Sequence, residues 1–212
     1  MIQLGKSSVV VDSGDVERLK LEFSEKHFVL LPRLLEPALL DFLFHRLEQA
    51  EWRDKEHKGI GTEVVSDDSP SLGLLHFLAN APAFLAAVGE ITGCMDMTWF
   101  GGRIYRFIAN SGHHDTWHSD YLNGRLVGMS LNLSPRVYQG GLFQLQERES
   151  KRILTEIANT GWGDATLFRI SNQLNHQVTE VTGENPKTAF AGWFQSEKPG
   201  LLAQLREQSG RL

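Results

Sequence analysis

A series of short, apolar, β-type runs begins near Met95, and it constrains the fold of this chain more than any other feature. The runs are 98–100, 103–108, 126–133, 142–146, 165–170, 176–181 and 187–194. Most of them are bounded by Gly, Pro, Asn, Ser or Asp, which are residues that favour turns. Many short strands separated by turns are typical of a β-sandwich, a barrel or a jelly roll.

The part before Met95 has helical character. Residues 36–51 place apolar side chains at helical spacing, and Pro37 suits a first helical turn. Shorter helices are expected at 16–26, 72–78 and 82–91, a strand at 27–31, and a strand or exposed loop at 59–66. We therefore expect a mainly β chain of the α+β class, with the N-terminal helices packed on one face of the β-core.

The length of 212 residues fits a single domain. We divide residues 1–212 into a helical support region (1–94), a β-core (95–196) and a C-terminal segment (197–212) with a closing helix at 201–208. This length is sufficient to bury a core without disulfides or structural metals.

Composition narrows the partners and the compartment. The net charge is −5 and no long block of like charges occurs, so a nucleic-acid partner is not expected. No apolar run reaches the eighteen or so residues that span a bilayer, and the first residues lack the apolar core of a signal peptide, so no membrane association is expected. Cys94 is the single cysteine, which excludes an internal disulfide and fits a cytoplasmic protein. The oligomeric state stays open.

The segment Trp117-His118-Ser119-Asp120 carries the first chemical signal. Residues i and i+2 of an extended chain project to the same face, so His118 and Asp120 would point the same way. An imidazole and a carboxylate in this arrangement supply two of the three ligands of a facial 2-His-1-carboxylate iron site.

A third ligand is expected on a distant strand. His176 is the only histidine after His118, and it lies in a run, 175–181, that alternates as a strand does. Strands that are distant in sequence face one another in a jelly roll, so the separation is no obstacle.

Lys187 is a candidate anchor for an anion. It opens the run 187–194, where a lysine inside a β-core is costly unless it is paired with an anion. A dicarboxylate that chelates iron at one end would meet Lys187 and the Thr188 hydroxyl at the other.

These pieces together resemble an iron(II)- and 2-oxoglutarate-dependent oxygenase of the prolyl 4-hydroxylase-like kind. The matching segments are 103–107, 118–120, 124–125, 131–134, 140–141, 163–168, 176–178 and 192–194, with Lys187 at the family's basic position. The resemblance covers about residues 95–196, and the N-terminal half shows no comparable signature.

The resemblance implies a double-stranded β-helix, also called a jelly roll. It implies that His118, Asp120 and His176 bind the iron and form the catalytic centre, that Lys187 binds the distal carboxylate of 2-oxoglutarate, and that Tyr105 touches this co-substrate. The implied cofactors are Fe(II), 2-oxoglutarate and O2, with ascorbate as a stimulant.

The reaction implied is oxidative decarboxylation of 2-oxoglutarate to succinate and CO2, coupled to hydroxylation of an unactivated C–H bond. Family members that halogenate lack the carboxylate ligand, so Asp120 favours hydroxylation, whereas desaturation and ring formation stay open. The substrate is a small molecule, an amino acid or a peptide. Trp117, Tyr121 and Arg125 are candidate substrate contacts, while Trp193 is expected in the core.

Several alternatives stay open. His113-His114-Asp115 also contains an H-x-D pattern, and we prefer 118–120 because a β-run beginning at Gly124-Arg125 follows it. His114 or Asp115 would then line the entrance, and Arg169 is a weaker candidate for the anchor. Two other functions compete: a cupin-like metal dioxygenase without 2-oxoglutarate, which usually adds a further His or Glu ligand, and a non-catalytic jelly-roll binding module.

Overall fold

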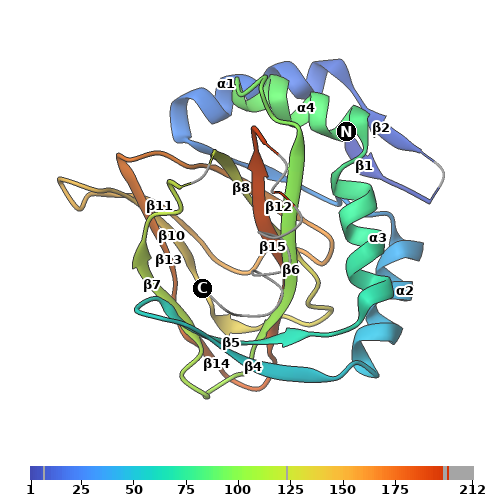
Figure 1. The fold of residues 1–212 in the computed structure, drawn as a ribbon, viewed down its shortest axis with the longest axis vertical. Coiled ribbons are helices and arrows are strands. Elements are labelled where there is room, and N and C mark those ends of the chain that lie inside the picture. The colour runs from blue at the N-terminus through green and yellow to red at the C-terminus, as the bar shows by residue number, and fades with distance from the viewer. Residues whose placement is uncertain (7, 123, 198–199, 201–212) are drawn as a thin grey trace.

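An eleven-stranded sheet is the central element of the computed structural model, which describes residues 1–6, 8–122, 124–197 and 200 (Figure 1). Its strands are β3 (Phe28–Leu31), β4 (Trp52–His57), β5 (Gly61–Ser66), β6 (Trp99–Phe107), β7 (His114–His118), β8 (Arg125–Asn132), β10 (Phe143–Glu147), β11 (Ile153–Ile157), β12 (Ala165–Arg169), β13 (Leu174–Val178) and β15 (Lys187–Gln195). Two small sheets pair β1 (Ile2–Leu4) with β2 (Val9–Val11), and β9 (Gln139–Gly140) with β14 (Val181–Thr182). The predicted closing helix at 201–208 lies outside the described residues.

The large sheet curls into two layers. The antiparallel order β6-β15-β8-β12-β3 makes one layer, and β7-β13-β10-β11 makes the other. Strand β5 pairs with both β6 and β7 and so joins the layers, while β4 extends the sheet from β5. This arrangement confirms the predicted double-stranded β-helix.

Four helices precede the main run of strands: α1 (Ser13–Lys26), α2 (Pro37–Glu48), α3 (Ser69–Ala79) and α4 (Pro82–Thr92). The Asp12 and Asp68 side chains cap α1 and α3 by accepting backbone N–H bonds, and α2 and α4 each begin with a proline. All four helices fall where the sequence predicts them, with bounds that differ by a few residues.

Two hydrophobic clusters show how the layers are held together. The larger one joins the buried faces of the helices, such as Phe23, Leu43 and Phe84, to Val127 and Phe194 of the first layer. The smaller one is a separate set of side chains from both layers, including Phe107 and Leu145. The helices therefore cover one face of the β-core, as predicted, and the other face is turned toward the second layer.

The glycine pair at 101–102 does not end a strand. The sequence predicts separate strands on either side of it, but β6 runs unbroken from Trp99 to Phe107. Gly102 pairs with Gly192 of β15, where an added Cβ on Gly192 would lie 2.0 Å from the Gly101 carbonyl oxygen. These glycines therefore lie inside a strand and permit the close approach of its partner, and they do not form a turn.

Other differences are local. Residues 52–66, which include the predicted strand or loop at 59–66, form the hairpin β4–β5, and strands β1, β2 and β11 were not predicted. Within the described part of the chain no single helix is long and apolar enough to cross a membrane, although the bent pair α3 and α4 passes that test by length and composition. The expectation of one domain over 1–212 stays a prediction.

Candidate active site

His118, Asp120 and His176 converge in one cluster, which we call the metal end of the cavity described below. His118 ends β7 and lies directly opposite His176 on the paired strand β13, and their ring centroids are 4.3 Å apart. The Asp120 Oδ1 atom lies 3.8 Å from His118 Nε2, and Oδ2 lies 3.4 Å from His176 Nε2. The possible ligand atoms all lie within 4.8 Å of one another.

This donor set fits iron. A first-row divalent ion holds nitrogen and oxygen ligands at about 2.0–2.2 Å, so neighbouring ligands of an octahedron lie about 3 Å apart. The distances in the cluster are slightly longer than this, so small shifts would close it around an ion. No other group of three or more His, Cys, Asp or Glu residues with this geometry occurs among the residues that the structure describes.

Hydrogen bonds orient the ligands. His118 Nδ1 lies 2.7 Å from the Thr116 carbonyl oxygen, which can only accept, so Nδ1 carries the proton and Nε2 keeps a lone pair for a metal. Asp120 Oδ2 accepts a 2.6 Å hydrogen bond from Trp193 Nε1. The Arg125 guanidinium lies 3.6 Å from Asp120 Oδ1 and 3.5 Å from the centre of the Trp193 ring.

The electrostatics of the metal end favour metal-binding protonation states. Burial lowers the pKa of His176 to about 4, so its ring is neutral near pH 7. Burial alone would raise the pKa of Asp120, but His176, the Trp193 hydrogen bond, His118 and Arg125 together lower it. A neutral imidazole and an ionised carboxylate are the forms that ligate iron.

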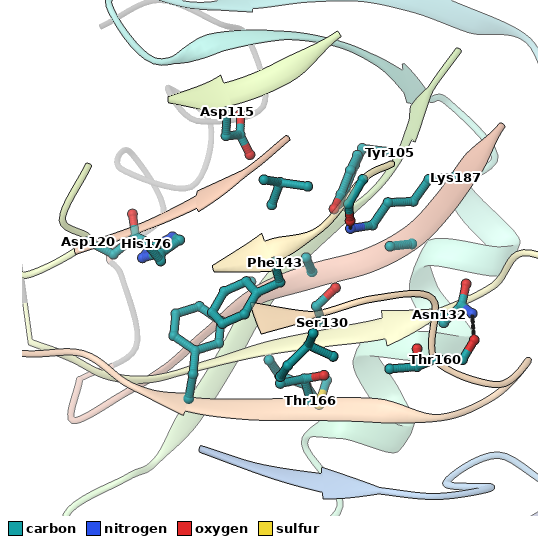
Figure 2. A pocket seen from close by; sticks show the side chains of 18 of the residues that line it. Tyr105, Asp115, Asp120, Ser130, Asn132, Phe143, Thr160, Thr166, His176 and Lys187 are labelled. Carbon is teal, nitrogen blue, oxygen red and sulfur yellow. Dashed lines mark hydrogen bonds and ion pairs between the residues drawn. The ribbon is translucent and has the colours of Figure 1, made fainter. Parts of the chain in front are cut away.

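A single cavity extends from the metal end to Lys187, which is where we define the anchor end (Figure 2). Lys187 is buried, donates a 3.0 Å hydrogen bond from Nζ to the Gly141 carbonyl oxygen, and lies 5.8 Å from the centre of the Tyr138 ring. Burial lowers the pKa of Lys187 to about 8, and Asp115 partly offsets this effect. The anchor end therefore holds an ammonium group whose pKa is close to neutral pH. A bound anionic group would pair with it and stabilise its charge.

Tyr105 lies in the cavity wall beside Lys187 (Figure 2). Burial raises the pKa of its hydroxyl well above the ordinary value, so the hydroxyl stays protonated and can donate a hydrogen bond. The prediction that Tyr105 contacts the co-substrate is compatible with this position.

Thr188 does not share the cavity with Lys187. Successive residues of a strand point to opposite faces, and the Thr188 hydroxyl accepts a 2.9 Å hydrogen bond from Arg106 Nε on the neighbouring strand. Thr188 is absent from the cavity lining, so the structure gives no support to the predicted contact between its side chain and the co-substrate.

The predicted substrate contacts also lie elsewhere. Trp117 is partly exposed and Tyr121 is 60 % exposed, and neither lines the cavity. Arg125 contacts Asp120 and Trp193 and does not line the cavity. Trp193, expected in the core, lines the cavity and bonds to Asp120. Strand alternation alone could not predict that Trp193 lines the cavity and contacts Asp120, because this contact depends on where the loop after β7 places Asp120.

The rival H-x-D pattern does not form a second cluster. His113 is buried and its Nδ1 accepts a hydrogen bond from the Ile108 amide, while His114 Nδ1 bonds to the Gly112 carbonyl oxygen. Asp115, however, lines the cavity, which agrees with the alternative that His114 or Asp115 lies at its entrance. Arg169, the weaker anchor candidate, lies over the Phe23 ring and is not part of the lining.

Arg103 and its partners were not identified from the sequence. Arg103 lines the cavity, and its guanidinium pairs with Glu63 through Nε and Nη2, while His57 Nε2 lies 2.9 Å from Glu63 Oε1. Burial by itself raises the pKa of Glu63, but Arg103 and His57 hold it at about 2. The alternation of Arg103 and Tyr105 on one strand was the available signal, since it places both on one face.

Comparison with known proteins agrees with this geometry. Residues 102–195 match the model of the 2OG-Fe(II) oxygenase superfamily. No curated protein sequence matches the chain. This matched region contains the ligand cluster and is that of a 2-oxoglutarate-dependent oxygenase, a class of enzyme whose cofactors are Fe(II), 2-oxoglutarate and O2.

Solved structures share the fold at low sequence identity. A prolyl-4-hydroxylase of Pseudomonas putida has a TM-score of 0.66 and 14% identity, covering 86% of this chain and 100% of its own. A prolyl hydroxylase of Trichoplax adhaerens, in complex with a hypoxia inducible factor peptide fragment, has a TM-score of 0.60 and 13% identity over 87% of this chain and 92% of its own. The epimerase SnoN from nogalamycin biosynthesis has a TM-score of 0.63 and 13% identity over 87% and 83%. These likenesses extend the fold match well into the N-terminal half.

Proposed function

We propose that this oxygenase hydroxylates an unactivated C–H bond of a small molecule, an amino acid or a peptide, with release of succinate and CO2. In this proposal His118, Asp120 and His176 hold Fe(II), and Lys187 binds the distal carboxylate of 2-oxoglutarate. Iron bound with 2-oxoglutarate and O2 supplies the oxidising power for this chemistry.

The observation that carries the proposal is the Asp120 carboxylate, held within ligand distance of both histidines. A carboxylate in the third ligand position occupies the place that a halide would need, and so favours transfer of oxygen to the substrate. Trp193 and Arg125 hold this carboxylate in place and keep it ionised.

The anchor end supports a co-substrate. Lys187 is a buried cation that donates a hydrogen bond to one backbone carbonyl and lies near the face of the Tyr138 ring. A buried ammonium gains most from an anionic partner, and the far carboxylate of 2-oxoglutarate would supply it at the opposite end of the cavity from the ligand cluster. A cupin-like dioxygenase without 2-oxoglutarate would have no use for such a cation.

Anaerobic titration of the protein with Fe(II) and 2-oxoglutarate tests the proposal. We expect a visible metal-to-ligand charge-transfer band, and release of succinate when O2 and a substrate are added with ascorbate. A protein that binds Fe(II) and 2-oxoglutarate without producing the band, or that releases no succinate with any substrate, would contradict it.

The substrate is proposed only as a class. One similar structure is a prolyl hydroxylase in complex with a peptide fragment, and another is an epimerase from nogalamycin biosynthesis. The proposal therefore includes both peptides and small molecules as substrates. We propose a cytoplasmic location on the absence of disulfide-forming cysteine pairs, and fractionation of the native host cells would test it.

A further inference from the structure

The cavity contains a carboxylate that none of the roles above uses. Asp115 lies on β7, and Figure 2 shows its carboxylate directed into the pocket between the metal end and Tyr105. It makes no hydrogen bond or ion pair with its side chain to any residue that the structure describes. It also lies outside the cluster of possible metal ligands.

A β-bulge aims Asp115 into the cavity. Asp115 and His118 are three residues apart, so in a regular strand they would point to opposite faces. Their partners on β13 are Val178 and His176, which are only two residues apart, so β7 carries one extra residue in this interval. A bulge of this kind re-aims a side chain, and bulges are frequent beside active sites.

The neighbouring strand is shaped to accept this geometry. Gly61 of β5 pairs with Asp115, and an added Cβ on Gly61 would lie 1.7 Å from the His114 carbonyl oxygen. Only a glycine allows β5 to approach the bulged strand so closely. Both sides of β7 are therefore arranged around the position of Asp115.

The nearest cation in the wall is already occupied. Arg103 pairs with Glu63 through two nitrogens, and Glu63 is fully buried. Burial raises the pKa of Asp115, Arg103 partly offsets this, and Glu63 raises it further. Arg103 is thus committed to Glu63, while the Lys187 ammonium donates to the Gly141 carbonyl oxygen at the anchor end, and neither cation forms an ion pair with Asp115.

A donor from outside the protein would complete the wall. 2-Oxoglutarate is an anion and would be repelled by Asp115, so the co-substrate does not supply it. A protonated amine carries both the charge and the N–H donors that a half-buried carboxylate in this cavity would bind. We propose that Asp115 is the specificity-determining residue for the substrate, and that it binds a protonated amine of a small amino compound.

This inference rests on the proposed function, and the test separates the two. The purified holoenzyme is assayed for 2-oxoglutarate consumption and succinate release with a panel of L-amino acids and short aliphatic diamines. Each compound is paired with the hydroxy analogue of equal chain length, in which oxygen replaces the amine. The charge-transfer band of the Fe(II)–2-oxoglutarate complex is recorded in parallel for every variant.

We expect at least one amine to raise succinate release above the substrate-free rate, while its hydroxy analogue does not. Asp115→Asn keeps the shape of the side chain but removes the charge, and it should lower kcat/KM for that amine at least tenfold. The charge-transfer band of the same variant at saturating 2-oxoglutarate shows whether the metal and the co-substrate are still bound, and we expect it to remain. Asp54→Asn, which removes an exposed acidic group from β4, is the matched control and should behave as the wild type.

Thermal stability provides a readout that separates recognition from a structural role. A raised pKa means that the charged form of Asp115 costs stability, and this cost is complete at pH values above the folded-state pKa. At pH 8 without substrate, Asp115→Asn should leave Tm unchanged or raise it by about 2–4 °C. A structural carboxylate would produce a loss of Tm in the same variant.

Three results would overturn the inference: hydroxy analogues that serve as well as amines, an Asp115→Asn variant with unchanged kcat/KM, or a panel in which no amine stimulates turnover. A wild-type protein without the charge-transfer band would overturn the proposed function instead. The two failures are therefore distinguishable.

Discussion

At the metal end of the cavity, Asp120 contacts two histidines, an indole N–H and a guanidinium. At the anchor end, Lys187 is buried with one backbone carbonyl and a tyrosine ring. The first group of charges is balanced by the protein before any ligand binds, while the second is not. The metal end is thus preorganised for an ion that must be held in one geometry, and the anchor end leaves part of its charge to be completed by a diffusible co-substrate.

The largest difference between the two ends should follow removal of the carboxylate ligand. Asp120→Ala deletes one of the three proposed ligands and removes the acceptor of the Trp193 hydrogen bond. We expect substrate-coupled succinate release to fall at least about a thousandfold, since a metal-bound site contributes several kcal/mol to the transition state. Succinate quantification under saturating 2-oxoglutarate measures the loss.

The control for this change is Asp96→Ala, which removes an exposed acidic group far from the cluster. It should retain full activity. Hydroxylation at a wild-type rate by Asp120→Ala would show that the balanced end does not hold the catalytic metal.

The second largest effect should appear at the anchor end. Lys187→Ala removes the buried cation, and truncating one partner of a buried charge pair costs about 2–5 kcal/mol. The KM for 2-oxoglutarate should rise by about a hundredfold, while Fe(II) affinity stays close to that of the wild type. Lys20→Ala, an exposed lysine on α1, serves as the control. An unchanged KM would remove Lys187 from co-substrate binding and make the two ends alike.

A smaller effect should come from the group that preorganises the metal end. Trp193→Phe keeps an aromatic ring beside Arg125 but deletes the hydrogen bond to Asp120. Loss of an outer hydrogen bond to a metal ligand typically costs 10- to 100-fold in metal affinity, so Fe(II) titration should show weakening within about that range. The KM for 2-oxoglutarate measured at saturating Fe(II) should change little. A large change in that KM would mean that the two ends are coupled through β15.

The smallest effect should be a pH dependence confined to the anchor end. The pKa of Lys187 in the free protein is about 8, because burial lowers it and Asp115 only partly offsets this. Protonated Lys187 binds the carboxylate, so affinity for 2-oxoglutarate is complete below pH 8 and falls as pH rises above it, by about tenfold per unit. Tyr105 and Tyr138 also line this end, and burial keeps both hydroxyls protonated throughout the range.

Isothermal titration with 2-oxoglutarate between pH 7 and 9.5 checks this dependence. Lys187→Arg keeps the charge at all these pH values and should flatten the profile. A wild-type profile that is already flat would show that the ammonium is stabilised in the free protein more strongly than its burial suggests.

Much of the fold followed from local patterns in the sequence. The apolar stripe of α2 and the prolines at the starts of α2 and α4 located the helices. The short runs bounded by turn residues located most strands of the β-core. The same reasoning failed at Gly101 and Gly102, because glycine serves both turns and close strand approach, and only the partner Gly192 distinguishes the two.

The candidate site divides in the same way. His118, Asp120, His176 and Lys187 were predicted from spacing and residue chemistry, and the structure brings the first three together and places the lysine at the far end of the same cavity. Their roles as ligands and anchor stay predictions that the variants above would test.

The parts that the sequence did not predict depend on register. Thr188 was assigned to the cavity although it alternates with Lys187, and Trp193 was assigned to the core although the loop after β7 brings Asp120 to it. The sequence left His114 and Asp115 as alternatives for the cavity entrance, because the choice depends on the extra residue of β7 relative to the strand beside it.

That extra residue also sets a length scale. Asp115 and His118 lie opposite Val178 and His176, two residues or about 7 Å apart along β13. If a substrate is held by its nitrogen at Asp115, the strand acts as a ruler between that nitrogen and the iron. The number of bonds between the amine and a given carbon would then determine whether that carbon reaches the iron. The spacing of residues along one strand would in this way set the regiochemistry of the reaction.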